Sequence, residues 1–193
     1  MIISERHPRL IFEIALSNAS ANGPMSWSRR SRLRRGCTRR GRRRWSRKVA
    51  SIPRGLFAHL DYLSARGVPG TTADLAQHDL IGPNRALADR EITQRLLPGI
   101  DGSRFVVRTD SHGGQLAAAR AGLGIAVVRC PIGLSDPRLR SVLPELAIPS
   151  LDTWLVMHPD LRDLPRVGVV FDHLAEAFPT YQRVGGDVPR RHR

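Results

Sequence analysis

Four consecutive polar side chains, Thr109, Asp110, Ser111 and His112, bring two hydroxyls, an acid and an imidazole together. They follow the apolar segment 105–107, and a helical pattern begins after them. At a strand-to-helix junction the first backbone N–H groups have no intrahelical partner and the helix dipole is positive, so an anion can bind there. A simpler role is capping of the helix by Asp110 or Ser111, and the two roles are compatible.

Nucleophilic catalysis is a second possible chemistry. Ser111 or Cys130 would be the nucleophile, and His78, His112 or His158 would be the base. Neither nucleophile lies in a Gly-x-Ser-x-Gly elbow or in a papain-like context. A hydrolase therefore ranks last among the candidate functions, and we expect that the protein is not an enzyme.

The cysteines give no sign of a metal site. Cys37 and Cys130 are far apart in the chain and outside any Cys-x-x-Cys or Cys/His cluster. This pattern excludes a zinc ribbon and a disulfide scaffold. We predict no metal and no cofactor.

Positive charge is concentrated in one segment. The formal net charge is +14, and residues 29–48 hold eleven Arg and one Lys with no acid, so this segment supplies +12 and the rest of the chain +2. Such a block can bind DNA or RNA without reading sequence, because it neutralises phosphates. The arginines that we expect to make these contacts are Arg34, Arg35, Arg39, Arg40, Arg42, Arg43 and Arg44.

The elements around residues 109–112 have α/β periodicity. The first, at 10–16, alternates apolar and other residues like a half-buried strand and precedes a polar turn. Later patterns predict a helix around 60–65, a strand at 105–107, a helix that Gly122 ends, a strand at 125–128 buried on both faces, a strand at 154–157 and a last helix that Pro179 ends. Leu116, Ala119 and Leu123 would form the buried face of the helix after His112. Between 23 and 48 no apolar period occurs, so we predict a disordered segment.

Length and hydropathy limit the class of protein. The chain has 193 residues, 41% of them hydrophobic, which suits one α/β domain or two small lobes. Its start has no basic n-region, and no apolar stretch reaches the roughly 20 residues of a membrane-spanning helix. We expect a cytoplasmic protein without a membrane partner.

The order and spacing of several short motifs resemble the effector-binding (substrate-binding) domain of LysR-type transcriptional regulators. The motifs are Leu56-Phe57-Ala58, Tyr62-Leu63, Asp74-Leu75-Ala76-Gln77-His78, Gly122-Leu123-Gly124-Ile125-Ala126, Leu143-Pro144-Glu145-Leu146 and Trp154-Leu155-Val156-Met157-His158-Pro159. Near the N-terminus, His7-Pro8-Arg9-Leu10 and the following strand are similar to the second strand of the family's first lobe. The resemblance covers residues 5–22 and about 49–178.

The resemblance implies a two-lobed α/β domain of the type 2 periplasmic-binding-protein fold, with lobe I incomplete. The expected divisions are a lobe I fragment at 1–22, the Arg-rich segment at 23–48, lobe II at 49–158, a return to lobe I with the C-terminal helix at 159–179, and a basic tail at 180–193. The family's helix-turn-helix, linker helix and first strand would all precede Met1, so we expect a truncated regulator.

The Arg-rich segment stands where the family has a strand of the pattern Ala-Asp-apolar-Ala-apolar-Arg. Similar length with unrelated composition suggests a compensated frameshift, because a shifted frame of GC-rich DNA is enriched in Arg, Gly, Trp, Cys, Pro and Ser codons. A real nucleic-acid-binding insert is the alternative.

By the resemblance, a small effector, often anionic or aromatic, binds between the lobes. We expect it to contact Thr109, Asp110, Ser111 and His112, with Asn18 and Ser20 facing them from lobe I. The expected protein partners are further copies of the chain or intact relatives. The alternative function is non-specific nucleic-acid binding through the Arg-rich segment.

Overall fold

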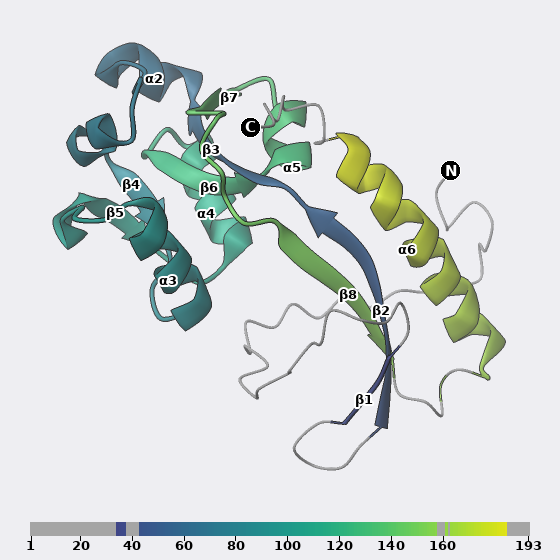
Figure 1. Ribbon diagram of the computed structural model, residues 1–193. Helices are drawn as coiled ribbons and strands as arrows, with labels where there is room; N and C mark the ends of the chain where they lie inside the picture. Colours follow the sequence, from purple (N-terminus) through teal and green to yellow (C-terminus); the bar gives the residue numbers. More distant parts are fainter. Residues whose placement is uncertain (1–33, 38–42, 158–160, 162, 185–193) are drawn as a thin grey trace. The chain divides into compact units, whose positions relative to one another are not determined.

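The computed structural model describes residues 34–37, 43–157, 161 and 163–184. The chain divides into two compact units (Figure 1). Unit 1 comprises Met1–Ser51 and Asp152–Tyr181, and unit 2 comprises Ile52–Leu151 and Gln182–Arg193. Each unit is described by itself below.

Unit 2 contains a five-stranded mixed sheet. Its strands are β3 (Arg54–His59), β4 (Leu80–Gly82), β5 (Phe105–Arg108), β6 (Ile125–Arg129) and β7 (Leu139–Val142). The order across the sheet is β5-β4-β6-β3-β7. β4 is parallel to β5 and β6, whereas β3 is antiparallel to β6 and β7. The strands predicted at 105–107 and 125–128 are confirmed as β5 and β6.

Helices connect these strands (Figure 1). They are α2 (Leu60–Arg66), α3 (Leu87–Leu96), α4 (His112–Arg120) and α5 (Cys130–Ser135), with 3-10 turns η1 (Ala73–Gln77) and η2 (Gly102–Arg104). α4 packs against β3, β4, β5 and β6, and α5 packs against β3, β6 and β7. The predicted helix around 60–65 is confirmed as α2.

Apolar side chains form two separate clusters, because successive residues of a strand point to opposite faces of the sheet. Leu56 and Ile125 belong to one cluster, which also contains Tyr62, Leu63 and Leu75 of the connecting segments. Phe57 and Ala126 belong to the other, which contains Ala118 and Ala119 of α4. The continuous apolar run of β6 is thus explained by burial on both faces.

Two glycines end α4 and begin β6. Gly122 has a φ of 72°, and the N–H groups of Gly122 and Leu123 donate to the carbonyls of Ala119 and Ala118, which is a Schellman ending. The predicted helix stop is confirmed. Gly124 has a φ of 155°, and a Cβ there would overlap the carbonyl oxygen of Asp79, which accepts a hydrogen bond from the N–H of Ile125 at 2.9 Å.

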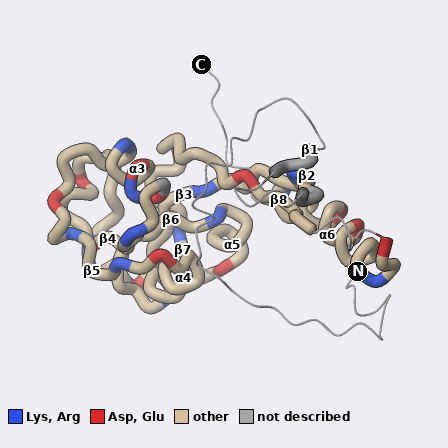
Figure 2. The backbone as a smooth tube through the Cα atoms, turned by 90° about the horizontal axis from the view of Figure 1, so that it is seen from below, with Lys and Arg blue, Asp and Glu red and all other residues tan. Residues whose placement is uncertain are grey.

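Charges of both signs are interspersed along unit 2 (Figure 2). Residues 52–151 contain eleven Arg, no Lys and nine Asp or Glu. The strong positive excess of the chain therefore lies elsewhere in the sequence.

Unit 1 contains a three-stranded sheet and a long helix. The strands are β1 (Arg34–Cys37), β2 (Arg43–Ile52) and β8 (Leu151–Met157) in the order β1-β2-β8, and β1 is antiparallel to β2. The carboxylate of Asp152 lies 2.6 Å from Lys48 Nζ and accepts a hydrogen bond from the Ser51 hydroxyl at 2.6 Å. The strand predicted at 154–157 is confirmed within β8.

The Arg-rich segment differs from the prediction where the structure describes it. No regular element was expected between 23 and 48, yet β1 and the first half of β2 pair there, and Ser46 is buried. Backbone hydrogen bonds need no apolar period, and β2 continues into the buried residues Val49, Ala50 and Ile52. Residues 23–33 and 38–42, and the strand predicted at 10–16, lie outside the described residues.

The last helix, α6 (Pro165–Val184), is longer than predicted. Pro179 was expected to end it, but the helix continues through Pro179 to Val184, so this boundary was wrong. A proline lacks one N–H and removes one rung of the hydrogen-bond ladder, a loss that a helix of 20 residues tolerates near its end. No helix of the described residues combines the length and the apolar composition of a membrane span.

Candidate functional site

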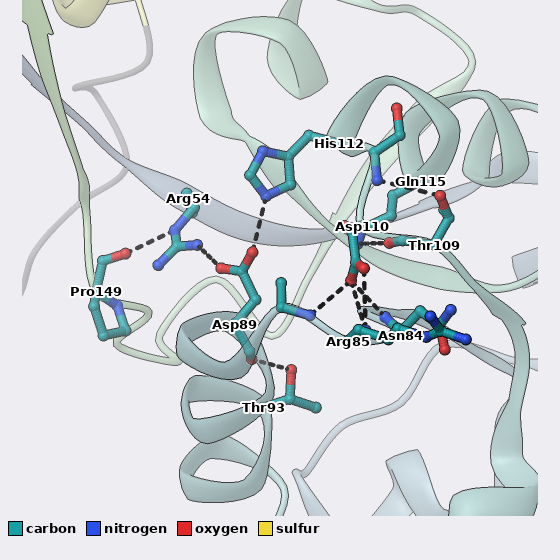
Figure 3. A network of polar contacts seen from close by, with 12 residues as sticks. Arg54, Asn84, Arg85, Asp89, Thr93, Thr109, Asp110, His112, Gln115 and Pro149 are labelled. Atoms are coloured by element: carbon teal, nitrogen blue, oxygen red, sulfur yellow. Dashed lines mark hydrogen bonds and ion pairs between the residues drawn. The ribbon is translucent and has the colours of Figure 1, made fainter. Parts of the chain in front are cut away.

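Four of the six residues predicted for the effector site, Thr109, Asp110, Ser111 and His112, lie where β5 passes into α4. The N–H of Thr109 donates to the carbonyl of Gly82 at 3.0 Å, so the carboxyl ends of the parallel strands β4 and β5 are joined at this point. Figure 3 shows the polar contacts around this junction. Open α/β sheets bind ligands at the carboxyl edge of their parallel strands.

Ser111 caps α4. Its hydroxyl accepts a hydrogen bond from the N–H of Gly114 at 3.2 Å, and its own N–H donates to the Thr109 hydroxyl at 3.2 Å. The predicted capping role is confirmed for Ser111. The first N–H groups of α4, those of His112 and Gly113, precede the intrahelical ladder, as at any helix start.

Asp110 serves a different helix. Its carboxylate accepts hydrogen bonds from the N–H groups of Asn84, Arg85 and Ala86 at 2.8 to 3.1 Å, directly before α3 (Figure 3). These bonds, first of all the one from Ala86, hold the pKa of Asp110 below its ordinary value of 3.8. The ionised Asp110 carboxylate is therefore held by backbone N–H groups of the same chain.

His112 joins α4 to α3 and β3 through Asp89. His112 Nε2 lies 3.3 Å from one carboxylate oxygen of Asp89, and Arg54 Nη1 lies 3.5 Å from the other (Figure 3). Arg54 Nε also donates to the carbonyl of Pro149 at 2.8 Å. The hydrogen bond with His112 makes the largest contribution to a lowered pKa of Asp89, and Arg54 adds to it.

Gln115 is a member of this network that the sequence prediction missed. It is 4% exposed, and its Nε2 donates to the carbonyl of Thr109 at 2.7 Å. The buried face of α4 therefore contains Gln115, Ala118 and Ala119, while Leu123 is 48% exposed, so the face predicted from Leu116, Ala119 and Leu123 was only partly right. The sequence feature that could have indicated this contact is the position of Gln115, one helical turn after the capping residue Ser111.

Two glycines leave the start of α4 uncovered by side chains. Gly113 and Gly114 occupy the second and third helical positions, and Gly113 is exposed. A Cβ at Gly113 would come no closer than 3.7 Å to another side chain, which is ordinary contact. A ligand can therefore approach the first N–H groups of the helix.

The four predicted effector contacts of unit 2 lie at one junction. The other predicted site residues belong to the N-terminal part of the chain, and their side chains are not described. Asn18 and Ser20 lie outside the described residues, as do Arg39, Arg40 and Arg42. The backbones of Arg34 and Arg35 belong to β1 and those of Arg43 and Arg44 to β2.

The groups considered for hydrolysis make other contacts. The Ser111 hydroxyl caps α4, the His112 ring faces Asp89, and His78 Nδ1 lies 3.2 Å from the Tyr62 hydroxyl. Cys130 is buried, and His158 lies outside the described residues. Within the described ranges no group of three His, Cys, Asp or Glu is arranged to hold a metal ion.

A family model supplies the class of this protein. The model of the LysR substrate binding domain matches residues 33–179, about three quarters of the chain. The chain therefore belongs to the LysR substrate-binding domain family. The match begins inside the Arg-rich segment and does not include residues 5–22, whose resemblance stays a prediction.

Solved structures of low identity share the fold. The regulatory domain of CrgA, a LysR-type transcriptional regulator from Neisseria meningitidis, is 18% identical with a TM-score of 0.59 over 76% of this chain and 74% of that one. The regulatory domain of AphB from Vibrio vulnificus is 18% identical with a TM-score of 0.57 over 90% of this chain and 87% of that one. These matches confirm the predicted fold class, a two-lobed periplasmic-binding-protein-like domain.

Longer relatives extend beyond the match. The chain covers 61% of full-length AphB from Vibrio cholerae, at 19% identity and a TM-score of 0.58, and 48% of full-length CrgA. No curated protein matches the sequence.

Proposed function

We propose that this chain is the effector-binding part of a LysR-type transcriptional regulator and that a small molecule binds where β5 meets α4. The observation that carries the proposal is the family match over residues 33–179, which includes all of this junction. Thr109, Ser111 and His112 would contact the effector, with the first N–H groups of α4.

The chemistry of the junction supports an oxygen-rich or anionic effector. The start of α4 offers N–H donors at the positive end of a helix dipole, and its two glycines add no side chain over them. Asp110 does not oppose an anion strongly, because its charge is matched by the three N–H donors before α3.

A labelled sample tests the proposal directly. We expect the amide resonances of His112 and Gly113 in the 15N-labelled full chain to shift saturably with at least one of sodium benzoate, sodium salicylate and sodium succinate. Sodium chloride at the same ionic strength is the reference titration.

Gly113→Leu provides the matched variant. The leucine would cover the donors without a backbone clash, so we expect the variant to fold and to lose the shifts. Gly70→Leu is the control, since its Cβ also meets only ordinary contact. Identical titrations of Gly113→Leu and the parent chain would contradict binding at this junction.

Association with DNA-bound relatives belongs to the same proposal. Full-length relatives are longer than the stretch that this chain matches. We propose that the chain acts with further copies or with intact relatives, and that any direct nucleic-acid binding through the Arg-rich segment is independent of sequence.

A further inference from the structure

Two arginines face each other across β3 and β6. Arg54 and Arg129 are register partners in this antiparallel pair. Directly opposite residues have their Cβ atoms about 4.5–5.5 Å apart on the same face, and like charges in such positions destabilise a sheet. Leu56 and Val127, two residues further along each strand, pack in the cluster around Tyr62, so both arginines lie at the edge of that face.

Few acceptors reach these guanidinium groups. The Arg54 side chain is 8% exposed, and its partners are the Pro149 carbonyl and Asp89, the latter at 3.5 Å, which is long for a hydrogen bond. Arg129 Nε is buried, and no residue of the described chain accepts a hydrogen bond from it. An unpaired buried donor destabilises a folded protein, and the effect is larger when the donor is charged.

The charges around the pair do not balance. Asp89 is the one carboxylate that the described residues bring within ion-pair distance of Arg54, and it is shared with His112. Among the described residues, no carboxylate lies within that distance of Arg129. Burial lowers the pKa of the Arg54 guanidinium, Asp89 opposes this decrease, and Arg129 adds to it. Two cations and one anion leave one positive charge unmatched.

We infer that Arg54 and Arg129 form a subsite for a carboxylate of the effector. The pair lies beside the junction described above, because Asp89 contacts both Arg54 and His112. A monoanion matches the unbalanced charge, and guanidinium groups bind carboxylate oxygens in a fixed planar geometry. The inference rests on the proposed function for the identity of the ligand as an effector, but the charge imbalance is independent of it.

Arginine side-chain resonances separate the two hypotheses. We expect the Arg129 Nε–H resonance of the full chain to shift saturably with sodium acetate and to respond less to inorganic phosphate at the same ionic strength. Shifts at the His112 and Gly113 amides without a response of Arg129 to any carboxylate would overturn the subsite and leave the proposed function standing. A response of Arg129 alone would support the subsite and count against the α4 contact.

A variant distinguishes a binding residue from a structural one. Arg129→Met removes the unpaired donor and the repulsion from Arg54, so without a carboxylate it should melt at the same temperature as the parent chain or higher. It should also lose the rise in melting temperature that acetate gives the parent. Arg140→Met on β7, which removes the same charge from an exposed position, should keep that rise. Arg129→Met melting clearly lower than Arg140→Met, or responding to acetate like the parent, would overturn the inference.

Discussion

At the scale of single residues, two neighbouring oxygen-bearing side chains support two different helices. Ser111 caps α4, to which it is joined in sequence, whereas Asp110 binds N–H groups before α3, more than twenty residues earlier. The sequence identified both residues as candidate caps. It could assign only the local partner, because a cap three residues away follows from helix geometry, and a partner in another loop depends on the sheet order that joins β4 to β5.

Replacement of Ser111 tests the local cap. Ser111→Ala should lower the free energy of unfolding by about 1 kcal/mol, since the Gly114 N–H loses its acceptor. Ser111→Asp should keep most of the stability, because aspartate caps as well as serine does. Urea denaturation measures both, and Ser64→Ala on the exposed side of α2 is the control. An equal effect of the alanine and aspartate variants would exclude a capping role.

Asp110 should make stability depend on acid. Its pKa is lowered in the folded protein, so its contribution is fully present above the ordinary pKa of 3.8 and is lost as the pH falls through the lower folded value. Asp110→Asn should therefore melt below the parent at pH 7, and this difference should shrink below pH 4. Glu91→Gln on α3 removes an exposed carboxylate and serves as the control. A difference between Asp110→Asn and the parent that is the same at pH 7 and pH 3 would show that the charge has no role.

At the scale of elements, sequence patterns predicted β5, β6 and the end of α4 in unit 2, but only part of the buried face of α4. β6 was recognisable because four consecutive apolar residues suit a strand covered on both faces, and Gly122 marked the end of α4. The buried face of α4 was not, because Gln115 is buried through one hydrogen bond to Thr109 that no apolar period reveals. The link from His112 through Asp89 to Arg54 was also missed. Its members belong to three elements, and a local sequence pattern does not show which elements lie side by side.

Gly124 is the position where backbone geometry is most restrictive. We expect Gly124→Ala to lower the free energy of unfolding by more than about 2 kcal/mol, since the new Cβ would overlap the Asp79 carbonyl at a φ unfavourable to other residues. Gly70→Ala, with ordinary contacts and no positive φ, should change stability much less. Chemical denaturation of both variants is the measurement, and equal stability of the two would refute the close approach.

At the scale of the whole molecule, the Arg-rich segment has an unusual composition and yet lies partly within the family match. The family match begins at residue 33 and so includes part of that segment, and the backbone at 34–37 pairs with that at 43–46 as antiparallel strands. Strand pairing depends on backbone groups, so it is compatible with a segment whose side chains were altered by a frameshift. Sequence composition alone could not separate these two properties.

The frameshift hypothesis makes a prediction about the gene. One of the other reading frames across codons 23–47 should encode a strand of the pattern Ala-Asp-apolar-Ala-apolar-Arg, as the family resemblance implies. Translation of the nucleotide sequence in all frames tests this. If no frame contains such a strand, the segment is an insert of its own and the nucleic-acid alternative gains weight.

The net charge of +14 predicts how the whole chain binds DNA. If seven arginines of the Arg-rich segment contact phosphates, the logarithm of the association constant should fall with the logarithm of salt concentration with a slope of about −6. Fluorescence anisotropy with duplexes of unrelated sequence should give the same affinity for each, because phosphate contacts carry no sequence information.

Replacing Arg34, Arg35, Arg43 and Arg44 together by glutamine should make the slope shallower by roughly 4. The same charge removed from unit 2, as Arg90, Arg95, Arg104 and Arg140 to glutamine, should leave most of the slope in place. Protection of one particular operator at physiological salt would contradict sequence-independent binding, because screening weakens phosphate contacts at every site alike.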